Sequence, residues 1–124
     1  MKYKIDVIRI GENYITVNGW AIGEDPFILV AYRVTDGARP VSSKLVRTRR
    51  DDVSQIYFGE VADTDLGFDI RFSYERGKTY FLEMQYRDPH GLKSRKTIRL
   101  NEKTIARRTS VSYKRMEKIK DLCN

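Results

Sequence analysis

The sequence has little cysteine and histidine and no long apolar run, and each scarcity narrows the class of protein. The only cysteine, Cys123, has no second thiol with which to form an intrachain disulfide or a zinc site. We therefore expect a reducing compartment, the cytoplasm. No stretch approaches the roughly 18 apolar residues of a membrane-spanning helix. The first residues, MKYKIDVIRIGENYI, mix charged and apolar side chains, so we expect no secretory signal.

The net charge of +7 is unevenly distributed along the 124 residues. Residues 103–124 contain seven Lys or Arg against Glu117 and Asp121, whereas residues 1–102 contain 17 basic and 15 acidic side chains. The body is nearly neutral and the basic character belongs to the end of the chain. We predict one domain over residues 1–101, and over residues 102–124 a basic linker with a short amphipathic helix that leads to an absent domain.

Alternation of apolar and polar residues predicts half-buried strands. In TYFLEMQYR the side chains of Tyr80, Leu82, Met84 and Tyr86 share one face, and FDIRFSY repeats the pattern. We expect a bulge near Val7 or Ile8, where the inward set of the opening strand changes phase. The apolar FILVAYRV, residues 27–34, suits a central strand covered on both faces.

Turn signals separate these strands at spacings of about ten residues, with no alternation of strands and helices. They are GEN, GEDP, TDGARP and DPHG. The pattern predicts an all-β fold, an antiparallel immunoglobulin-like β-sandwich, with a short basic C-terminal helix. We expect the side chains of Trp20, Phe68, Ile70 and Phe72 in its core. For the sole tryptophan, the alternative is an exposed stacking platform for a sugar ring.

The segment VRTRRDDVSQIYF, residues 46–58, predicts a structural crossover between the halves of the sandwich. Asp51 or Asp52 can accept hydrogen bonds from backbone N–H groups that open a single helical turn at VSQIYF. Arg49 or Arg50 can pair with a carboxylate such as Asp69 on a neighbouring strand. We therefore assign Arg50, Asp52 and Asp69 to the crossover. In the alternative, the arginines face outward and bind a phosphate or an acidic sugar.

The sequence offers few parts for catalysis. His90 lies alone in the turn DPHG, and Cys123 lies near the end of the chain, without a nucleophile–base arrangement around either. Asp63 and Asp65 form DTD, which superficially matches the DxD that holds a metal and a nucleotide in many glycosyltransferases; we interpret them as loop residues. We expect no catalytic residue, metal ligand or cofactor in this chain, and no enzyme activity of the chain alone.

Three segments together resemble a known domain. IDVIRIGENYITVNGWAIG, RTRRDDVSQIYF and LGFDIRFSYERGKTYFLEM are similar to the β-sandwich that precedes the catalytic domain in some family 2 glycosyltransferases of Firmicutes. The resemblance covers roughly residues 3–100. Its marks are Gly19-Trp20-Ala21, Arg50-Asp51-Asp52-Val53 and Gly67-Phe68-Asp69-Ile70.

The resemblance implies that a GT-A catalytic domain, using a nucleotide sugar and a divalent metal, follows the basic tail. It also implies a role in polysaccharide or cell-wall glycan synthesis at the inner face of the membrane, where the tail could meet anionic lipid. The expected function is that of a non-catalytic accessory domain, which positions the enzyme through contacts with a glycan, a protein or another copy of itself.

For a glycan we expect the binding residues to be Arg47, Arg49 and Tyr57, together with Tyr74, Arg76 and Lys78 of the YERGK loop. The alternative function is a basic nucleic-acid-binding β-barrel, in which RTRR, SRK and exposed aromatics would contact a single strand. The near-neutral body and the core-like positions of most aromatics make nucleic acid the less favoured partner.

Overall fold

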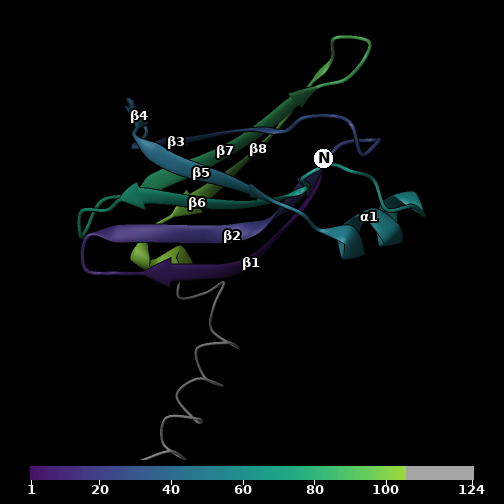
Figure 1. Cartoon of the computed structure of the whole chain (residues 1–124). Helices are drawn as coiled ribbons and strands as arrows, with labels where there is room; N and C mark the ends of the chain where they lie inside the picture. Colours follow the sequence, from purple (N-terminus) through teal and green to yellow (C-terminus); the bar gives the residue numbers. More distant parts are fainter. Residues whose placement is uncertain (106–124) are drawn as a thin grey trace, which may run out of the picture.

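The structure is a computed structural model that describes residues 1–105; the predicted tail helix beyond Ile105 lies outside the described residues. Two four-stranded antiparallel sheets pack face to face, as the sequence predicts (Figure 1). The elements are β1 (Lys2–Ile10), β2 (Tyr14–Ile22), β3 (Ala31–Thr35), β4 (Pro40–Val41), β5 (Ser43–Thr48), α1 (Asp51–Phe58), β6 (Gly67–Ser73), β7 (Tyr80–Arg87) and β8 (Lys93–Leu100). Among the described residues, no helix is long and apolar enough to cross a membrane.

The order of strands is that of an immunoglobulin-like sandwich. Sheet A has the order β1-β2-β6-β5 and sheet B the order β4-β3-β7-β8. Each successive pair of strands along the chain forms one antiparallel unit, and these units alternate between the two sheets. The pairings β2–β6 and β3–β7 join two such units into each sheet. This is the ABED and C′CFG arrangement of that fold, with C′ reduced to two residues.

The main core lies between the sheets and follows the predicted alternation. Tyr80, Leu82, Met84 and Tyr86 of β7 are buried, while Glu83 and Gln85 between them are partly exposed. Phe68, Ile70 and Phe72 of β6 face them from sheet A and are also buried. Burial of this many large apolar side chains supplies the dominant stabilisation of the domain.

The prediction of a central strand over residues 27–34 is wrong in its first half. Pro26 lacks an N–H, and the Asp25 carboxylate accepts a hydrogen bond from the backbone N–H of Phe27 at 2.8 Å. This Asx turn folds the chain away from the sheet, so pairing begins only at Ala31. The side chains of Phe27 and Leu29 are consequently 73% and 69% exposed.

The bulge in β1 falls at Asp6, between Ile5 and Val7. The partner strand provides Gly19 at this point, where an added Cβ would overlap the carbonyl oxygen of Lys4. The unpaired residue of a bulge turns its side chain out of the regular alternation. The Asp6 carboxylate is thereby directed toward the start of α1.

Candidate ligand-binding groove

Arg50 anchors the β5–α1–β6 connection, but its partner differs from the predicted one. Its Nη1 lies 2.7 Å from the Asp6 carboxylate, and its Nη2 lies 2.9 Å from that of Asp52. Asp69, the predicted partner, pairs with Asn18 and Val46 in the middle of sheet A, whereas Arg50 lies beyond the Thr48–Gly67 pair at the end of the sheet. The bulge brings Asp6 to Arg50 instead.

The Arg50 side chain also crosses Gly67. An added Cβ at Gly67 would lie 2.7 Å from the Arg50 Cγ and would overlap the Thr48 hydroxyl. The guanidinium of Arg50 holds the pKa of Asp52 down at about 2. Arg49 instead pairs with Asp51 and Asp63 at the surface. The crossover is therefore a clamp of Arg50, Asp6 and Asp52.

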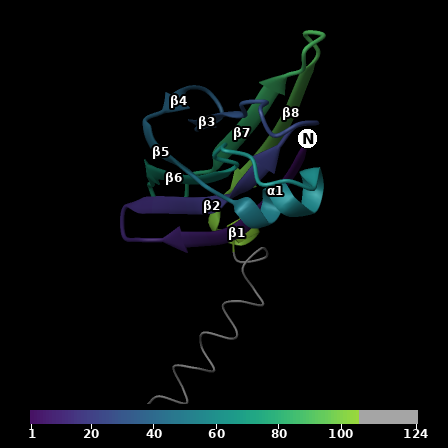
Figure 2. The same cartoon turned by 45° about the vertical axis from the view of Figure 1, so that its right-hand side comes forward.

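Helix α1 covers the outer face of sheet A at the end of β2 (Figure 2). It is longer than the predicted single turn, its N-cap is Arg50, and no side chain caps it. Trp20 is buried beneath it, with Ile22, Val53 and Leu66, in a cluster separate from the main core. Trp20 is thus a core residue of the helix–sheet contact rather than of the sandwich interior.

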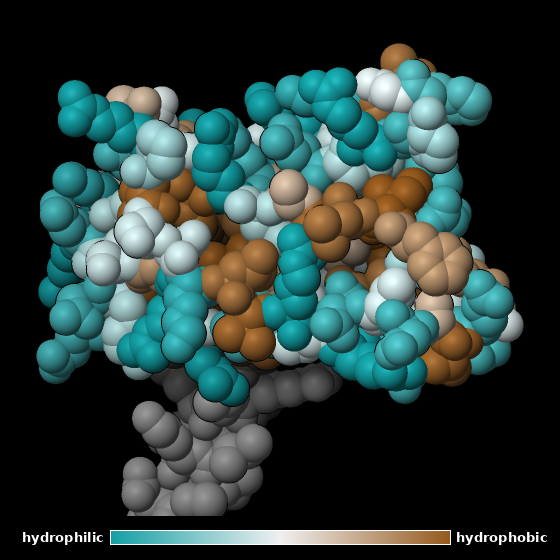
Figure 3. Space-filling model, turned by 45° about the horizontal axis from the view of Figure 1, so that its top comes forward, coloured by the Kyte–Doolittle hydropathy of each residue, from teal (hydrophilic) through white to brown (hydrophobic). Residues whose placement is uncertain are grey.

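Beside this cluster, the loop between β2 and β3 and the loop between α1 and β6 enclose a groove of about 170 Å³. Its apolar lining comes from residues such as Phe27 and Leu29, and its polar lining from Arg47, Thr64 and Asp65. In the space-filling view, an apolar patch lies on the right, at the end of the molecule where α1 lies, and further apolar surface lies in the centre and on the left (Figure 3). We refer to this hollow as the groove.

Arg47 is fixed at one wall of the groove. Its Nη2 donates a 2.8 Å hydrogen bond to the carbonyl oxygen of Val30, and its guanidinium lies 5.4 Å from the centroid of the Tyr32 ring. The Tyr32 ring packs against Phe68 with centroids 4.6 Å apart, and burial raises the pKa of Tyr32. A planar donor is therefore held rigidly between the core and the groove.

The hydroxyl of Thr64 is the unsatisfied polar atom of this site. Thr64 Oγ1 is buried and has no hydrogen-bond partner among the described residues. Buried polar atoms are normally satisfied, and Thr64 lines the groove, so a turn of this side chain toward the hollow would give its hydroxyl a hydrogen-bond partner in a bound ligand. The exposed carboxylate of Asp65 lines the same groove.

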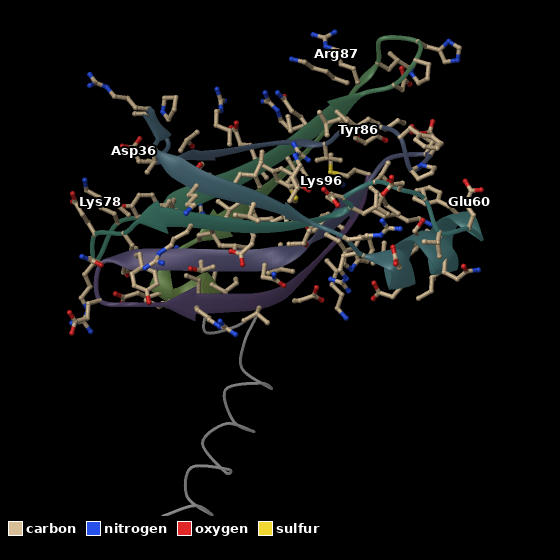
Figure 4. All side chains as sticks on the ribbon, in the orientation of Figure 1. Asp36, Glu60, Lys78, Tyr86, Arg87 and Lys96 are labelled. Carbon is tan, nitrogen blue, oxygen red and sulfur yellow. The ribbon has the colours of Figure 1, made fainter. Side chains whose placement is uncertain are left out.

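The structure does not bring the predicted glycan-binding residues together. Of the six, Arg47 alone lines the groove, and Tyr57 lines a different hollow with Lys2 and Tyr86. Tyr74, Arg76 and Lys78 follow β6, whereas the groove precedes it, so they lie at the opposite end of the sandwich (Figure 4 labels Lys78 and Glu60 at the two ends).

Tyr74, one of the predicted glycan-binding residues, is buried rather than exposed. Its side chain is buried in the main core, and its hydroxyl donates a 2.9 Å hydrogen bond to the Glu102 carboxylate. Sequence reasoning also missed Phe27, Leu29 and Thr64. The signal for the first two was the Asp25-Pro26 pair, which begins a turn before the apolar run.

Neither a metal site among the described residues nor a similar protein gives further information on the groove. Within residues 1–105, no three His, Cys, Asp or Glu side chains are grouped so that they could hold a metal ion. No protein-family model, curated protein or solved structure matches the chain. The groove is therefore interpreted from its own chemistry.

Proposed function

We propose that the chain is a non-catalytic accessory domain of a family 2 glycosyltransferase and that it binds a glycan acceptor in the groove. The nucleotide sugar, the divalent metal and the transfer reaction would belong to a catalytic domain of the same protein, acting in polysaccharide or cell-wall glycan synthesis at the inner face of the membrane. The resemblance of residues 3–100 to such domains supports the first part of this proposal.

The observation that carries the glycan contact is the mixed lining of the groove. A sugar ring has an apolar face and a rim of hydroxyl groups. The exposed ring of Phe27 offers a stacking surface, while the Arg47 guanidinium and the unpartnered Thr64 hydroxyl offer hydrogen bonds to the rim. The carboxylate of Asp65 supplies an acceptor for further hydroxyl groups.

The groove is small, so we expect it to hold one or two sugar residues of a longer chain. An apolar wall with a few fixed polar groups is typical of sites that discriminate by shape and hydrogen bonding. Arg47 already uses one N–H on Val30, which fixes its plane and leaves other N–H groups for a ligand.

The proposal can be tested by titrating the ¹⁵N-labelled chain with a panel of cell-wall and capsular oligosaccharides. We expect shifts of the backbone signals of Leu29, Thr64 and Asp65. Phe27→Ala should weaken binding about tenfold, or about 1.4 kcal/mol, through the loss of stacking. Arg76→Ala, a surface change at the opposite end, is the matched control and should bind normally. Shifts that cluster around Lys78, or equal losses in both variants, would refute the groove as the glycan site.

A further inference from the structure

The outer face of sheet B is basic. The pairing of β3, β7 and β8 places alternate side chains of the three strands on this face. Its charged members are five cations and one anion: Arg33, Arg87, Lys93, Arg95 and Arg99 against Glu83. The net charge of residues 1–102 is nearly neutral and hides this basic face, because acidic residues lie on other parts of the domain.

Three of these cations have neither a carboxylate partner nor an aromatic ring beneath them. Arg33 is neutralised by Glu83 at 2.6 Å, and Arg99 lies over the Phe81 ring at 5.9 Å from its centroid. Among the described residues, Arg87, Lys93 and Arg95 form no ion pair, and Arg95 donates a hydrogen bond to the side-chain oxygen of Gln85 at 3.5 Å. Their charges are therefore available to an anionic partner.

These three cations lie on one face at the base of the β7–β8 hairpin, which projects from the body (Figure 1; Figure 4 labels Arg87). Leu92 at the hairpin is 70% exposed. The one acidic residue of the turn, Asp88, uses a carboxylate oxygen to accept hydrogen bonds from the N–H groups of His90 and Leu92. These hydrogen bonds hold the turn of the hairpin in a fixed conformation. The exposed Leu92 side chain lies there, farther from the body than the three cations.

We propose that this face docks on the surface of an anionic lipid bilayer, with the hairpin inserted among the headgroups. Basic side chains near such a surface are attracted to it, and an exposed apolar side chain beside them gains by entering the boundary of the acyl chains. Single-stranded nucleic acid fits less well, because the Phe81 ring that would stack on bases is covered by Arg99.

The charge of the α1 end sets the orientation. The connection between β5 and β6 carries five acidic residues, Asp51, Asp52, Glu60, Asp63 and Asp65, against Arg49 and Arg50. An anionic surface repels this end, so the domain lies with sheet B against the bilayer. The docking surface is separate from the groove and does not depend on the glycan proposal.

The test measures binding of the full chain to phosphatidylcholine vesicles with and without phosphatidylserine. The hairpin variant combines Arg87→Gln, Lys93→Gln and Arg95→Gln. The control combines Arg9→Gln, Lys44→Gln and Arg71→Gln, three exposed residues that form one row across the outer face of sheet A. Both variants lose the same charge and both keep the basic tail. Any difference in their affinity for the vesicles therefore reports the position of the charges on sheet B or sheet A.

We expect binding only to the phosphatidylserine vesicles. Each lost cation should weaken it about fivefold, so the hairpin variant should bind about a hundredfold more weakly and the control less than tenfold. Leu92→Ser, which keeps every charge, should weaken binding several-fold and provides a check that does not alter electrostatics. Equal losses in the two triple variants would overturn the proposal, as would unchanged vesicle binding with lost affinity for single-stranded oligonucleotides, which would indicate a nucleic-acid surface.

Discussion

Replacing Arg50 with methionine should destabilise the domain by about 2 kcal/mol. The side chains of Arg50 and Asp6 are 27% and 24% exposed, so their ion pair is largely removed from water. Breaking a fully buried pair by removing one partner costs about 3–5 kcal/mol, and breaking an exposed one about 0–1 kcal/mol. The Arg50 pair lies between these limits. Methionine retains the methylenes that pack over Gly67, so the loss reports the charge rather than the packing.

Arg49→Met is the matched control, because it removes the neighbouring arginine and the same charge. Arg49 pairs with Asp51 and with Asp63, whose side chain is 98% exposed. We expect a loss below about 0.5 kcal/mol. Urea unfolding followed by circular dichroism measures both, and the urea dependence of the free energy of unfolding should be unchanged.

A double-mutant cycle with Asp6→Asn isolates the pair. Arg50→Met leaves Asp6 with an uncompensated charge, and Asp6→Asn removes that charge, so the double variant should be more stable than the sum of the single losses predicts. We expect a coupling of about 1 kcal/mol. If Arg50→Met costs no more than Arg49→Met, or if the losses add within about 0.4 kcal/mol, the bulge does not serve to place Asp6 against Arg50.

Three further predictions concern the same end of the molecule. Trp20→Ala should cost about 3–4 kcal/mol by opening a cavity beneath α1, measured by urea unfolding; a loss below 1 kcal/mol would show that α1 is not held by this residue. Gly67→Ala should cost about 2 kcal/mol, seen as a lower melting temperature, because its methyl group would displace Arg50 and Thr48. Because the folded-state pKa of Asp52 is lowered to about 2, its stabilisation is complete above the unfolded pKa of about 4 and is lost as the pH falls toward 2. The difference in stability between the wild type and Asp52→Asn should therefore shrink over that range in acid titrations, and a difference independent of pH would contradict the assignment.

Much of the fold follows from periodicity alone. The alternation in residues 68–73 and 80–87 predicts which side chains are buried, because a strand presents successive side chains to opposite faces. Periodicity does not predict whether a buried side chain is covered by the opposite sheet or by a helix on the outer face of its own sheet. The prediction that Trp20 is buried is confirmed, although α1 rather than the opposite sheet covers it.

The ion pairs and the groove depend on register, which the sequence does not show. The bulge at Asp6, one residue before Val7, decides that Arg50 meets Asp6, and the pairing of β6 with β2 and β5 keeps Asp69 in the middle of sheet A. The groove depends on two loops, separated by about 35 residues along the chain, that meet only in the folded state. The sequence indicates Arg47 because an arginine can bind a ligand wherever it is exposed, whereas Thr64 becomes a candidate only through the residues that surround it in the folded structure.

The alternation of strand pairs between the sheets has a consequence for synthesis of the protein. Each pair is local in sequence and can form early. Neither sheet can be completed, however, until a later pair of strands has been synthesised. Sheet A is incomplete until Ser73 has been made, and sheet B until Leu100. During this interval, the apolar faces of the first pair, including Ile15 and Val17, have no opposite layer to cover them. The nascent chain thus passes through a long stage in which chaperones and neighbouring chains compete for the surface that becomes its core.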